Sequence, residues 1–374
     1  MDAFDVGVVG AGVIGLAVAR ELSARGHRVV VLEKNRRPGL EQTTHNSGVV
    51  HAGFTPRPGT LRARLAVAGN SLLYREARRW GVPIEASGTL VVAQTAGEMA
   101  RLESLYRQGR ENGVPGLRLI EPSEARTIEP HLGACAAAIL APSGGRVSAV
   151  RLVEALQAEL LRRGARIDLG TPLSEVRPRP SGGWSLVSPN GTEYSVRYAV
   201  NSCGVASGRV AGWFGAQGLR VYPCAGEYAV VRNEKAKWVR SMIYGLPRPG
   251  YPGIGVHLTR SLDGPLLLGP TARYQDDETA SASPTTPLEE FAAEVAPILP
   301  GLDASDLVRG ATGVRAKLAP PGSSEAFEDY VIREEPAGSG AIQLVGIESP
   351  GLTASLAVGE YVARLIDASE RRGA

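Results

Sequence analysis

Two histidines and an arginine are the residues whose types and positions could perform chemistry. The chain has only five histidines; His51 lies in a polar segment over residues 43–53, and His257 lies in the apolar run 254–258. An imidazole titrates near neutral pH and can accept a proton, although a histidine inside a strand is more often a hydrogen-bonded core residue. Arg315 is flanked by small apolar residues, and its planar guanidinium is suited to binding a carboxylate through two hydrogen bonds.

Lys317 is predicted to add a second positive charge. If the segment around Arg315 is extended, both side chains point to the same face, because side chains alternate along a strand. Two cations on one face would suit a dicarboxylate. The remaining histidines are interpreted differently: His27 as a surface residue, His131 as structural, and His45 as a residue that holds a loop or a cofactor.

The N-terminal segment predicts the elements that position a ligand. Residues 4–9 read as a buried strand, and a G-x-G-x-x-G sequence follows over residues 10–15. Apolar residues then recur at helical spacing up to Gly26, and a second apolar strand over residues 28–32 ends in Glu33. In this fingerprint the glycines let the backbone approach a pyrophosphate at the helix N-terminus, and the acidic residue binds ribose hydroxyls. Glu33 would repel a 2′-phosphate, which disfavours NADP.

Three later segments favour FAD over NAD as the dinucleotide. Residues 43–53 form a long non-periodic stretch that is dense in hydrogen-bonding groups, and such a loop is usually functional. The apolar strand 198–204 ends in small residues, where backbone can approach a ligand. Near the C-terminus, the strand 341–346 leads through residues 347–355 into a helix whose N-terminus could face the electron-rich edge of a reduced flavin. No second glycine fingerprint exists for a nicotinamide cofactor.

Composition restricts the remaining classes. The chain has 374 residues, 43% of them hydrophobic and 21% charged, which is typical of a globular protein of two or three structural units. The net charge of +3 gives no basis for binding nucleic acid. Three widely spaced cysteines predict no disulfide framework and no metal site, as in a reducing cytoplasm. The cysteine usage therefore predicts a cytoplasmic protein. We expect it to be soluble, because no apolar run reaches the roughly 18 residues of a transmembrane helix; peripheral membrane contact stays open.

The sequence resembles the glycine-oxidase/D-amino-acid-oxidase superfamily of FAD-dependent oxidoreductases, and most of all its L-2-hydroxyglutarate dehydrogenase/oxidase group. The residues that carry the resemblance are the fingerprint, residues 45–53, 255–259, 268–270 and 313–316, and the C-terminal strand-to-helix segment. They span nearly the whole chain in order. The resemblance implies an α/β fold: a Rossmann-like FAD-binding domain with a mostly parallel sheet and an inserted β-rich α+β substrate domain. The expected FAD-binding domain comprises residues 1–85, 146–215 and 307–374, and the substrate-binding domain comprises residues 86–145 and 216–306.

The fingerprint and the resemblance together predict the residues that contact FAD. In the N-terminal half they are Gly10, Ala11, Gly12, Val13, Ile14, Gly15, Glu33, Lys34, Thr44, His45, Asn46, Ser47 and Gly48. In the rest of the chain they are Val176, Ser202, Cys203, Gly204, Gly346, Ser349, Pro350, Gly351, Leu352 and Thr353. The expected catalytic residues are His51, His257, Arg315 and Lys317, with either histidine as the base. Lys317 is included because it alternates with Arg315, since members of the group often have glutamine at its position.

The implied activity is oxidation of a 2-hydroxy acid, L-2-hydroxyglutarate or a similar molecule, to the 2-oxo acid. Hydride would pass to flavin N5, and the electrons then to oxygen or a quinone. One alternative is oxidation of an amino or imino acid, which the same fold supports. A non-catalytic flavin-binding or sensing protein is a second alternative, and an NAD-dependent dehydrogenase is the least favoured.

Overall fold

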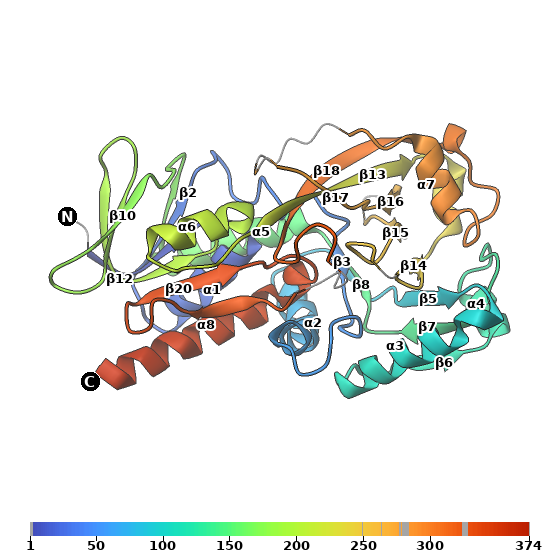
Figure 1. Cartoon of the computed structure of the whole chain (residues 1–374), viewed down its shortest axis with the longest axis horizontal. Coiled ribbons are helices and arrows are strands. Elements are labelled where there is room, and N and C mark those ends of the chain that lie inside the picture. The colour runs from blue at the N-terminus through green and yellow to red at the C-terminus, as the bar shows by residue number, and fades with distance from the viewer. Residues whose placement is uncertain are drawn as a thin grey trace.

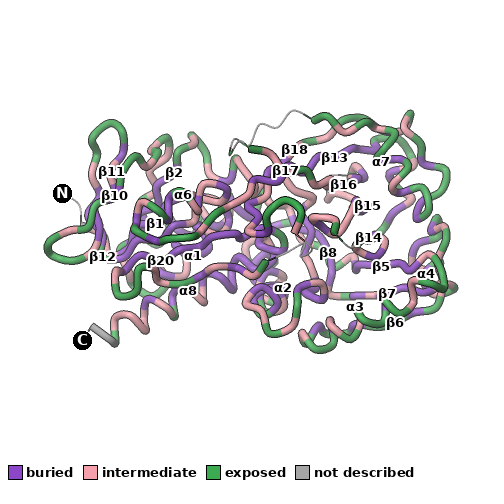
Figure 2. Tube along the Cα trace, in the orientation of Figure 1, coloured by how far each residue is buried: buried purple, intermediate pink, exposed green. Residues whose placement is uncertain are grey.

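The protein is built around two large sheets that lie side by side along its long axis (Figure 1). The structure is a computed structural model, and it describes residues 3–248, 250–262, 264–276, 278, 284–323 and 328–373. Both termini lie at the same end of the molecule, beside the first sheet. Most strands of both sheets are largely buried, whereas exposed residues lie mainly in turns, loops and the outer helices (Figure 2).

The first sheet has eight strands and a parallel centre. The central strands, in spatial order, are β9 (Arg166–Leu169), β2 (Val29–Glu33), β1 (Ala3–Val9), β12 (Glu193–Asn201) and β20 (Ala341–Val345). The antiparallel strand β19 (Val331–Glu334) pairs with β20, and the hairpin of β10 (Glu175–Pro178) and β11 (Trp184–Val187) pairs with β12. Parallel strands of this kind bring their carboxyl ends to one edge, where ligands bind in such folds.

Helices cover both faces of the first sheet. On one face lie α1 (Val13–Ala24), α5 (Ala149–Arg162) and α8 (Gly351–Gly373), which share a hydrophobic core with β1, β12 and β20. On the other face, α6 (Ser207–Trp213) and apolar side chains of the β10–β11 hairpin form a second core with β1, β2 and β12. Helices α1 and α8 cross closely, because a Cβ on Gly359 would lie 2.7 Å from the carbonyl oxygen of Ala17.

The second sheet has nine strands, and nearly all of its pairings are antiparallel. Its strands are β5 (Thr89–Ala93), β6 (Arg118–Ile120), β7 (Ala137–Ala141), β13 (Tyr222–Val231), β14 (Met242–Gly245), β15 (His257–Arg260), β16 (Leu266–Gly269), β17 (Arg273–Tyr274) and β18 (Leu307–Lys317). Eight of them follow the order β17-β13-β16-β15-β14-β5-β7-β6, and β18 pairs with β13. The helices here are α3 (Met99–Glu111), α4 (Pro122–Ile128) and α7 (Leu288–Val295).

Smaller elements connect the two sheets. A three-stranded sheet of β3 (Val49–Val50), β8 (Gly145–Val147) and β4 (Ile84–Glu85) lies beside α2 (Leu61–Arg79). Short 3₁₀ turns occupy Ala96–Glu98, Gly204–Ala206, Glu234–Trp238 and Ala304–Asp306. Within the described residues, no helix is both long and apolar enough to cross a membrane.

The predicted fold class is confirmed: a Rossmann-like unit with a largely parallel sheet is joined to a β-rich unit. One predicted boundary is wrong. Strand β18, assigned to the FAD-binding segment that begins at residue 307, pairs with β13 along most of its length and so belongs to the second sheet. The sequence of β18 indicates an extended strand but carries no sign of which sheet accepts it.

Candidate active site

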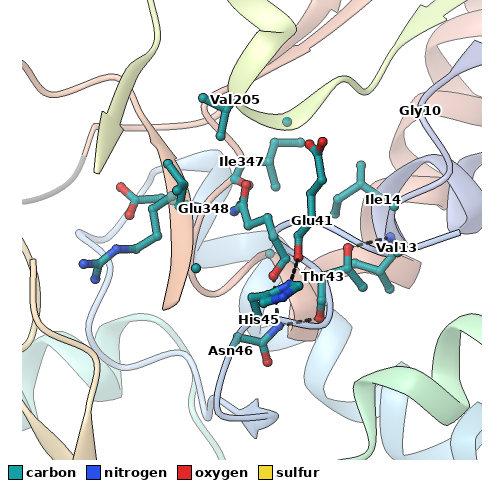
Figure 3. Close-up of a pocket in the computed structure, with 18 of the residues that line it drawn as sticks. Gly10, Val13, Ile14, Glu41, Thr43, His45, Asn46, Val205, Ile347 and Glu348 are labelled. Atoms are coloured by element: carbon teal, nitrogen blue, oxygen red, sulfur yellow. Dashed lines mark hydrogen bonds between the residues drawn. The ribbon is translucent and has the colours of Figure 1, made fainter. Parts of the chain in front are cut away.

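One elongated cavity runs from the glycine turn after β1 to the second sheet. Its walls come from both sheets, because the loop 39–51, the end of β12 and the turn 347–352 face residues of β13, β15 and β18. In Figure 3, Gly10 and Ile14 lie on one side of the cavity and Glu348 lies on the other, with the loop that carries Glu41, Thr43 and His45 between them. The cavity thus joins the predicted cofactor turn to the predicted substrate residues.

A buried carboxylate marks the end of the cavity nearest β2. Glu33 is 7% exposed, and its two oxygens accept the backbone N–H groups of Ala11 and Asn35, each at 2.8 Å. These bonds fix the carboxylate at the cavity wall. Segment 171–173 and Trp213 complete this end. An anchored acid at the end of the second strand is the group that binds the ribose of a dinucleotide.

The glycine turn leaves backbone open to the cavity. Gly10 has a φ of +100°, and a Cβ on it would lie 2.7 Å from the carbonyl oxygen of Ser202. A Cβ on Gly15 would overlap the carbonyl oxygen of Gly10. The N-terminus of helix α1 faces the cavity, because Gly12, Val13 and Ile14 line it. The Val13 N–H donates to Thr43 Oγ1 at 3.1 Å. This arrangement fits a pyrophosphate at the helix N-terminus.

The loop that follows β2 is held by its own hydrogen bonds. His45 Nδ1 lies 2.8 Å from the carbonyl oxygen of Glu41 (Figure 3). Asn46 donates to the carbonyl oxygens of Gln42 and Thr43 and accepts the N–H of Gly48 at 2.7 Å. His45 therefore orders the loop, the structural part of the role expected for it.

His51 and the C-terminal turn meet at the far end of the cavity. Its Nε2 lies 3.1 Å from Ser349 Oγ, and its backbone N–H donates to Thr353 Oγ1 at 3.0 Å. Its carbonyl oxygen accepts from Asn70 Nδ2 at 3.0 Å. Burial, with a smaller contribution from the Arg62 cation, lowers the pKa of His51 to about 4. The imidazole is therefore neutral near pH 7 and can accept a proton.

His257 lies in the same cavity and is more deeply buried. It is 4% exposed and begins β15, and its Nε2 lies 3.3 Å from Ser47 Oγ. Burial first, and then the proximity of His51 and Arg315, lower the pKa of His257 to about 3. The structure thus brings the two predicted histidines together, although His51 lies in the loop after β3 and His257 lies in β15 of the second sheet.

Arg315 lies in β18 and lines the cavity beside His257. Its Nη2 donates to the carbonyl oxygen of Thr271 and, at 3.4 Å, to that of Ala225. Its Nε is buried and has no hydrogen-bond partner among the described residues. A guanidinium that lines a cavity is suited to bind an anion, because it can form charge-assisted hydrogen bonds.

Lys317 does not supply the predicted second cation. It is fully buried, does not line the cavity, and its Nζ bonds to Glu348 Oε1 at 2.9 Å. Arg315 and Lys317 do alternate along β18 as predicted, but the Lys317 ammonium forms its ion pair behind the cavity wall. The prediction for Val176 is also wrong: Val176 packs in the hydrophobic core with Trp184, and residues 171–173 line the cavity instead, because they follow β9 directly.

Most other predicted contacts line the cavity. These are Gly10, Gly12, Val13, Ile14, Glu33, Lys34, His45, Asn46, Ser47, Ser202, Cys203, Gly204, Ser349, Pro350, Gly351 and Leu352. Six lie behind its wall: Ala11, Gly15, Thr44, Gly48, Gly346 and Thr353. Gly346, for example, has a φ of +75°, and a Cβ there would overlap Leu318. These residues shape the wall without being part of its surface.

Some wall residues were not predicted from the sequence. Thr43, Tyr228 and Glu348 line the cavity, as does Arg209 near the Glu33 end. Thr43 carried a signal, since a threonine can cap a helix and accepts the Val13 N–H here. The others come from a strand, a helix and a turn with no sequence pattern that marks them as ligand contacts.

Comparison with known proteins agrees with this geometry. The sequence model of the DAO family, described as FAD dependent oxidoreductase, matches residues 5–365. The chain is 33% identical to a mitochondrial L-2-hydroxyglutarate dehydrogenase of Arabidopsis thaliana, over 96% of this chain and 82% of that protein. It is 30% identical to a glycerol 3-phosphate dehydrogenase of Caloramator mitchellensis, over 96% of this chain and 73% of that protein.

A solved structure is similar over nearly the whole chain. The L-α-glycerophosphate oxidase of Mycoplasma pneumoniae, determined with FAD bound, superimposes with a TM-score of 0.88. It is 26% identical, and the match covers 98% of this chain and 95% of that one. The cofactor is therefore FAD, for which the glycine turn, Glu33 and the cavity provide a fitting site. The chain belongs to the DAO family of FAD-dependent oxidoreductases.

Proposed function

We propose that this enzyme oxidises the secondary alcohol of a small anionic substrate, with a 2-hydroxy acid such as L-2-hydroxyglutarate as the leading candidate. One observation carries the proposal. Two neutral imidazoles, His51 and His257, and the guanidinium of Arg315 line the cavity whose other end is the FAD cradle. An anion site beside a neutral base is what alcohol oxidation next to a carboxylate requires.

Each of these residues has a separate role in the proposed reaction. Arg315, whose guanidinium lines the cavity, binds the anionic group. One imidazole takes the hydroxyl proton at Nε2, either His51 beside Ser349 or His257 beside Ser47. FAD, when bound, supplies the two-electron acceptor for the hydride that leaves the carbinol carbon. Loss of that hydride and of the hydroxyl proton converts the alcohol into a ketone, which balances the reaction.

The charges around the cavity bear on the choice of substrate. Among the described residues that line it, Arg315 is the one cation at the histidine end, since Lys34 and Arg209 lie near Glu33. With Lys317 paired behind the wall, one anionic group of the substrate is matched by a charge and a second is not. A 2-hydroxy acid needs one such group beside its hydroxyl, and the second carboxylate of L-2-hydroxyglutarate would have no matching cation among these residues.

Glycerol 3-phosphate is the second candidate. It also carries a secondary hydroxyl near an anionic group, and two of the similar proteins named above are a glycerol 3-phosphate dehydrogenase and an L-α-glycerophosphate oxidase. The same three residues would serve, with the phosphate at Arg315. We propose oxygen or a quinone as the final electron acceptor for either substrate.

An anaerobic screen separates the candidates. The FAD-loaded protein is mixed with L-2-hydroxyglutarate, a 2-hydroxy monocarboxylate, glycerol 3-phosphate and a set of amino acids, and loss of the visible flavin absorbance is followed. We expect fastest reduction with a 2-hydroxy acid. Reduction by glycerol 3-phosphate alone would select the second candidate, and reduction by amino acids alone would reject both.

A further inference from the structure

A buried charge cluster lies directly behind the histidine end of the cavity. Lys317 is 0% exposed, Glu348 2% and Arg62 4%. Lys317 Nζ lies 2.9 Å from Glu348 Oε1, and Arg62 Nη1 lies 3.8 Å from the same oxygen. Burying three ionised groups is costly and adds less stability than an apolar cluster of the same volume would. Packing alone therefore does not explain why these three charged side chains are buried together.

Three separate elements hold the cluster rigidly. Lys317 ends β18, Arg62 lies in the first turn of α2, and Glu348 lies in the turn after β20. Arg62 donates to the carbonyl oxygens of Glu328, at 3.1 Å, and Ser349. Tyr330 donates its hydroxyl to the carbonyl oxygen of Glu348 at 3.0 Å and lies under the Arg62 guanidinium. The charges therefore have fixed positions.

The cluster borders the cavity itself. Glu348 and Ser349 line the wall beside His51 and Arg315, and Figure 3 shows Glu348 on the side opposite Gly10. Glu348 Oε2 is buried and has no hydrogen-bond partner in the described part of the chain, so no described donor offsets the carboxylate on that side. Asp329 also lies nearby, but it is partly exposed and caps the N-terminus of α2 by accepting the N–H groups of Leu61 and Arg62.

The cluster borders the end of the cavity that would hold the redox ring. FAD bound in an extended form, with its adenosine half at Glu33, would place its ring at the end near the histidines. Reduction adds negative charge to that ring, and fixed charges act strongly across a medium that water does not screen. Burial lowers the pKa of Lys317 and the Glu348 carboxylate opposes this shift.

We propose that Lys317 and Glu348 are positioning residues that set the reduction potential of bound FAD with opposite signs. The Lys317 ammonium favours the reduced, more negative cofactor, and it also fixes the carboxylate. The Glu348 carboxylate disfavours the reduced cofactor. The proposal needs bound FAD but no particular substrate. It can therefore be wrong while the proposed alcohol oxidation is right, and it can be right while the proposed alcohol oxidation is wrong.

The midpoint potential of FAD in the holoenzyme, measured against a reference dye without substrate, tests the proposal. We expect Lys317→Met to lower the potential and Glu348→Gln to raise it, each by about a tenfold change in the ratio of oxidised to reduced cofactor, or about 30 mV for a two-electron couple. Lys317→Arg keeps the charge and is expected to stay near the wild-type potential.

The chain offers a matched control. Lys237 and Glu234 form an ion pair of the same residue types at 2.7 Å, with side chains 67% and 89% exposed. Lys237→Met and Glu234→Gln are expected to leave the potential unchanged. Shifts of the same sign in both buried variants, or no shift in either, would overturn the proposal. If Lys317→Met does not fold, Lys317→Gln and Glu348→Gln provide the same comparison of sign.

Discussion

His51 Nε2 lies 3.1 Å from Ser349 Oγ, so a loop from the N-terminal third of the chain meets the turn that precedes the last helix. The contact is reinforced by the backbone of His51, which donates to Thr353 Oγ1. His51 thus has a hydroxyl rather than a carboxylate at its ring nitrogen. Its imidazole is oriented without being stabilised as a cation, which suits a proton acceptor.

Replacing the histidines one at a time identifies the base. We expect His51→Asn or His257→Asn to slow flavin reduction by a 2-hydroxy acid by about 10²- to 10⁴-fold, the usual contribution of general base catalysis, with a smaller loss in the other variant. Stopped-flow measurement of anaerobic reduction gives the rate.

His131 provides the control for these variants, because it is exposed and stacks on Trp238 with ring centres 4.7 Å apart. His131→Asn should reduce flavin at the wild-type rate. If both cavity variants also do so, the assignment of a histidine base is wrong and amine oxidation, which depends less on a protein base, gains support.

The pH dependence of the reaction follows from the buried imidazoles. The folded-state pKa of His51 is about 4 and that of His257 about 3, both below the ordinary value of 6.5. Lowered pKa values keep the neutral base available until the pH falls toward 4. The rate of flavin reduction should therefore stay level from pH 8 down to about 5 and fall only below that. If the rate of flavin reduction instead fell with a midpoint near pH 6.5, the base would not be an imidazole with a lowered pKa.

Arg315 is expected to govern substrate affinity. A charge-assisted hydrogen bond contributes about 1.5–3 kcal/mol, so Arg315→Met should raise the dissociation constant of the substrate roughly 10- to 100-fold. FAD binding should change little, because the guanidinium bonds to Thr271 and Ala225 and not to the glycine turn. Titration of flavin reduction against substrate concentration measures the effect.

Arg177 is the matched control for that change. It lies exposed on β10 and pairs with Glu175. Arg177→Met should leave the substrate dependence unaltered. If flavin reduction depends on substrate concentration in the same way in Arg315→Met and in the wild type, Arg315 does not bind the substrate.

The glycine turn gives a test of the cofactor cradle. In Gly15→Ala the new methyl group would overlap the carbonyl oxygen of Gly10 and approach Ser202 Oγ to 2.6 Å. Forcing an extra carbon into a packed site costs about 1–3 kcal/mol, and the displaced turn should bind FAD more weakly. Fluorescence titration of the apoprotein with FAD measures the loss.

Gly212 in α6 provides the control, because a Cβ there would meet no described atom within 4 Å outside its own helix. Gly212→Ala should bind FAD normally and be more stable by about 0.4–1 kcal/mol, because alanine restricts the unfolded chain. Normal FAD affinity in Gly15→Ala would contradict the tight contact in the turn.

Local patterns predicted the β-α-β unit well. Strands β1 and β2, the glycine turn and Glu33 are contiguous in sequence, so their signals of burial, turn chemistry and spacing agree. The resemblance extended this to the cavity, and His51, His257 and Arg315 all line it. The prediction of these three residues depended on the residue types within short segments of the sequence.

What the sequence could not predict depends on contacts between distant segments. Lys317 alternates correctly with Arg315, yet its partner Glu348 lies 31 residues away and turns the ammonium from the cavity. Strand β18 reads the same whichever sheet it joins. The prediction for Val176 is wrong for the same reason, because the hairpin that carries it pairs with β12 and packs Val176 into a hydrophobic core.

The most direct test of the proposed function is anaerobic mixing of the FAD-loaded protein with L-2-hydroxyglutarate, beside the Arg315→Met variant. We predict that the visible flavin absorbance is lost in the wild type, that 2-oxoglutarate is formed in equal amount, and that the variant needs a much higher substrate concentration. An unchanged flavin spectrum with L-2-hydroxyglutarate, other 2-hydroxy acids and glycerol 3-phosphate would contradict oxidation of an anionic alcohol.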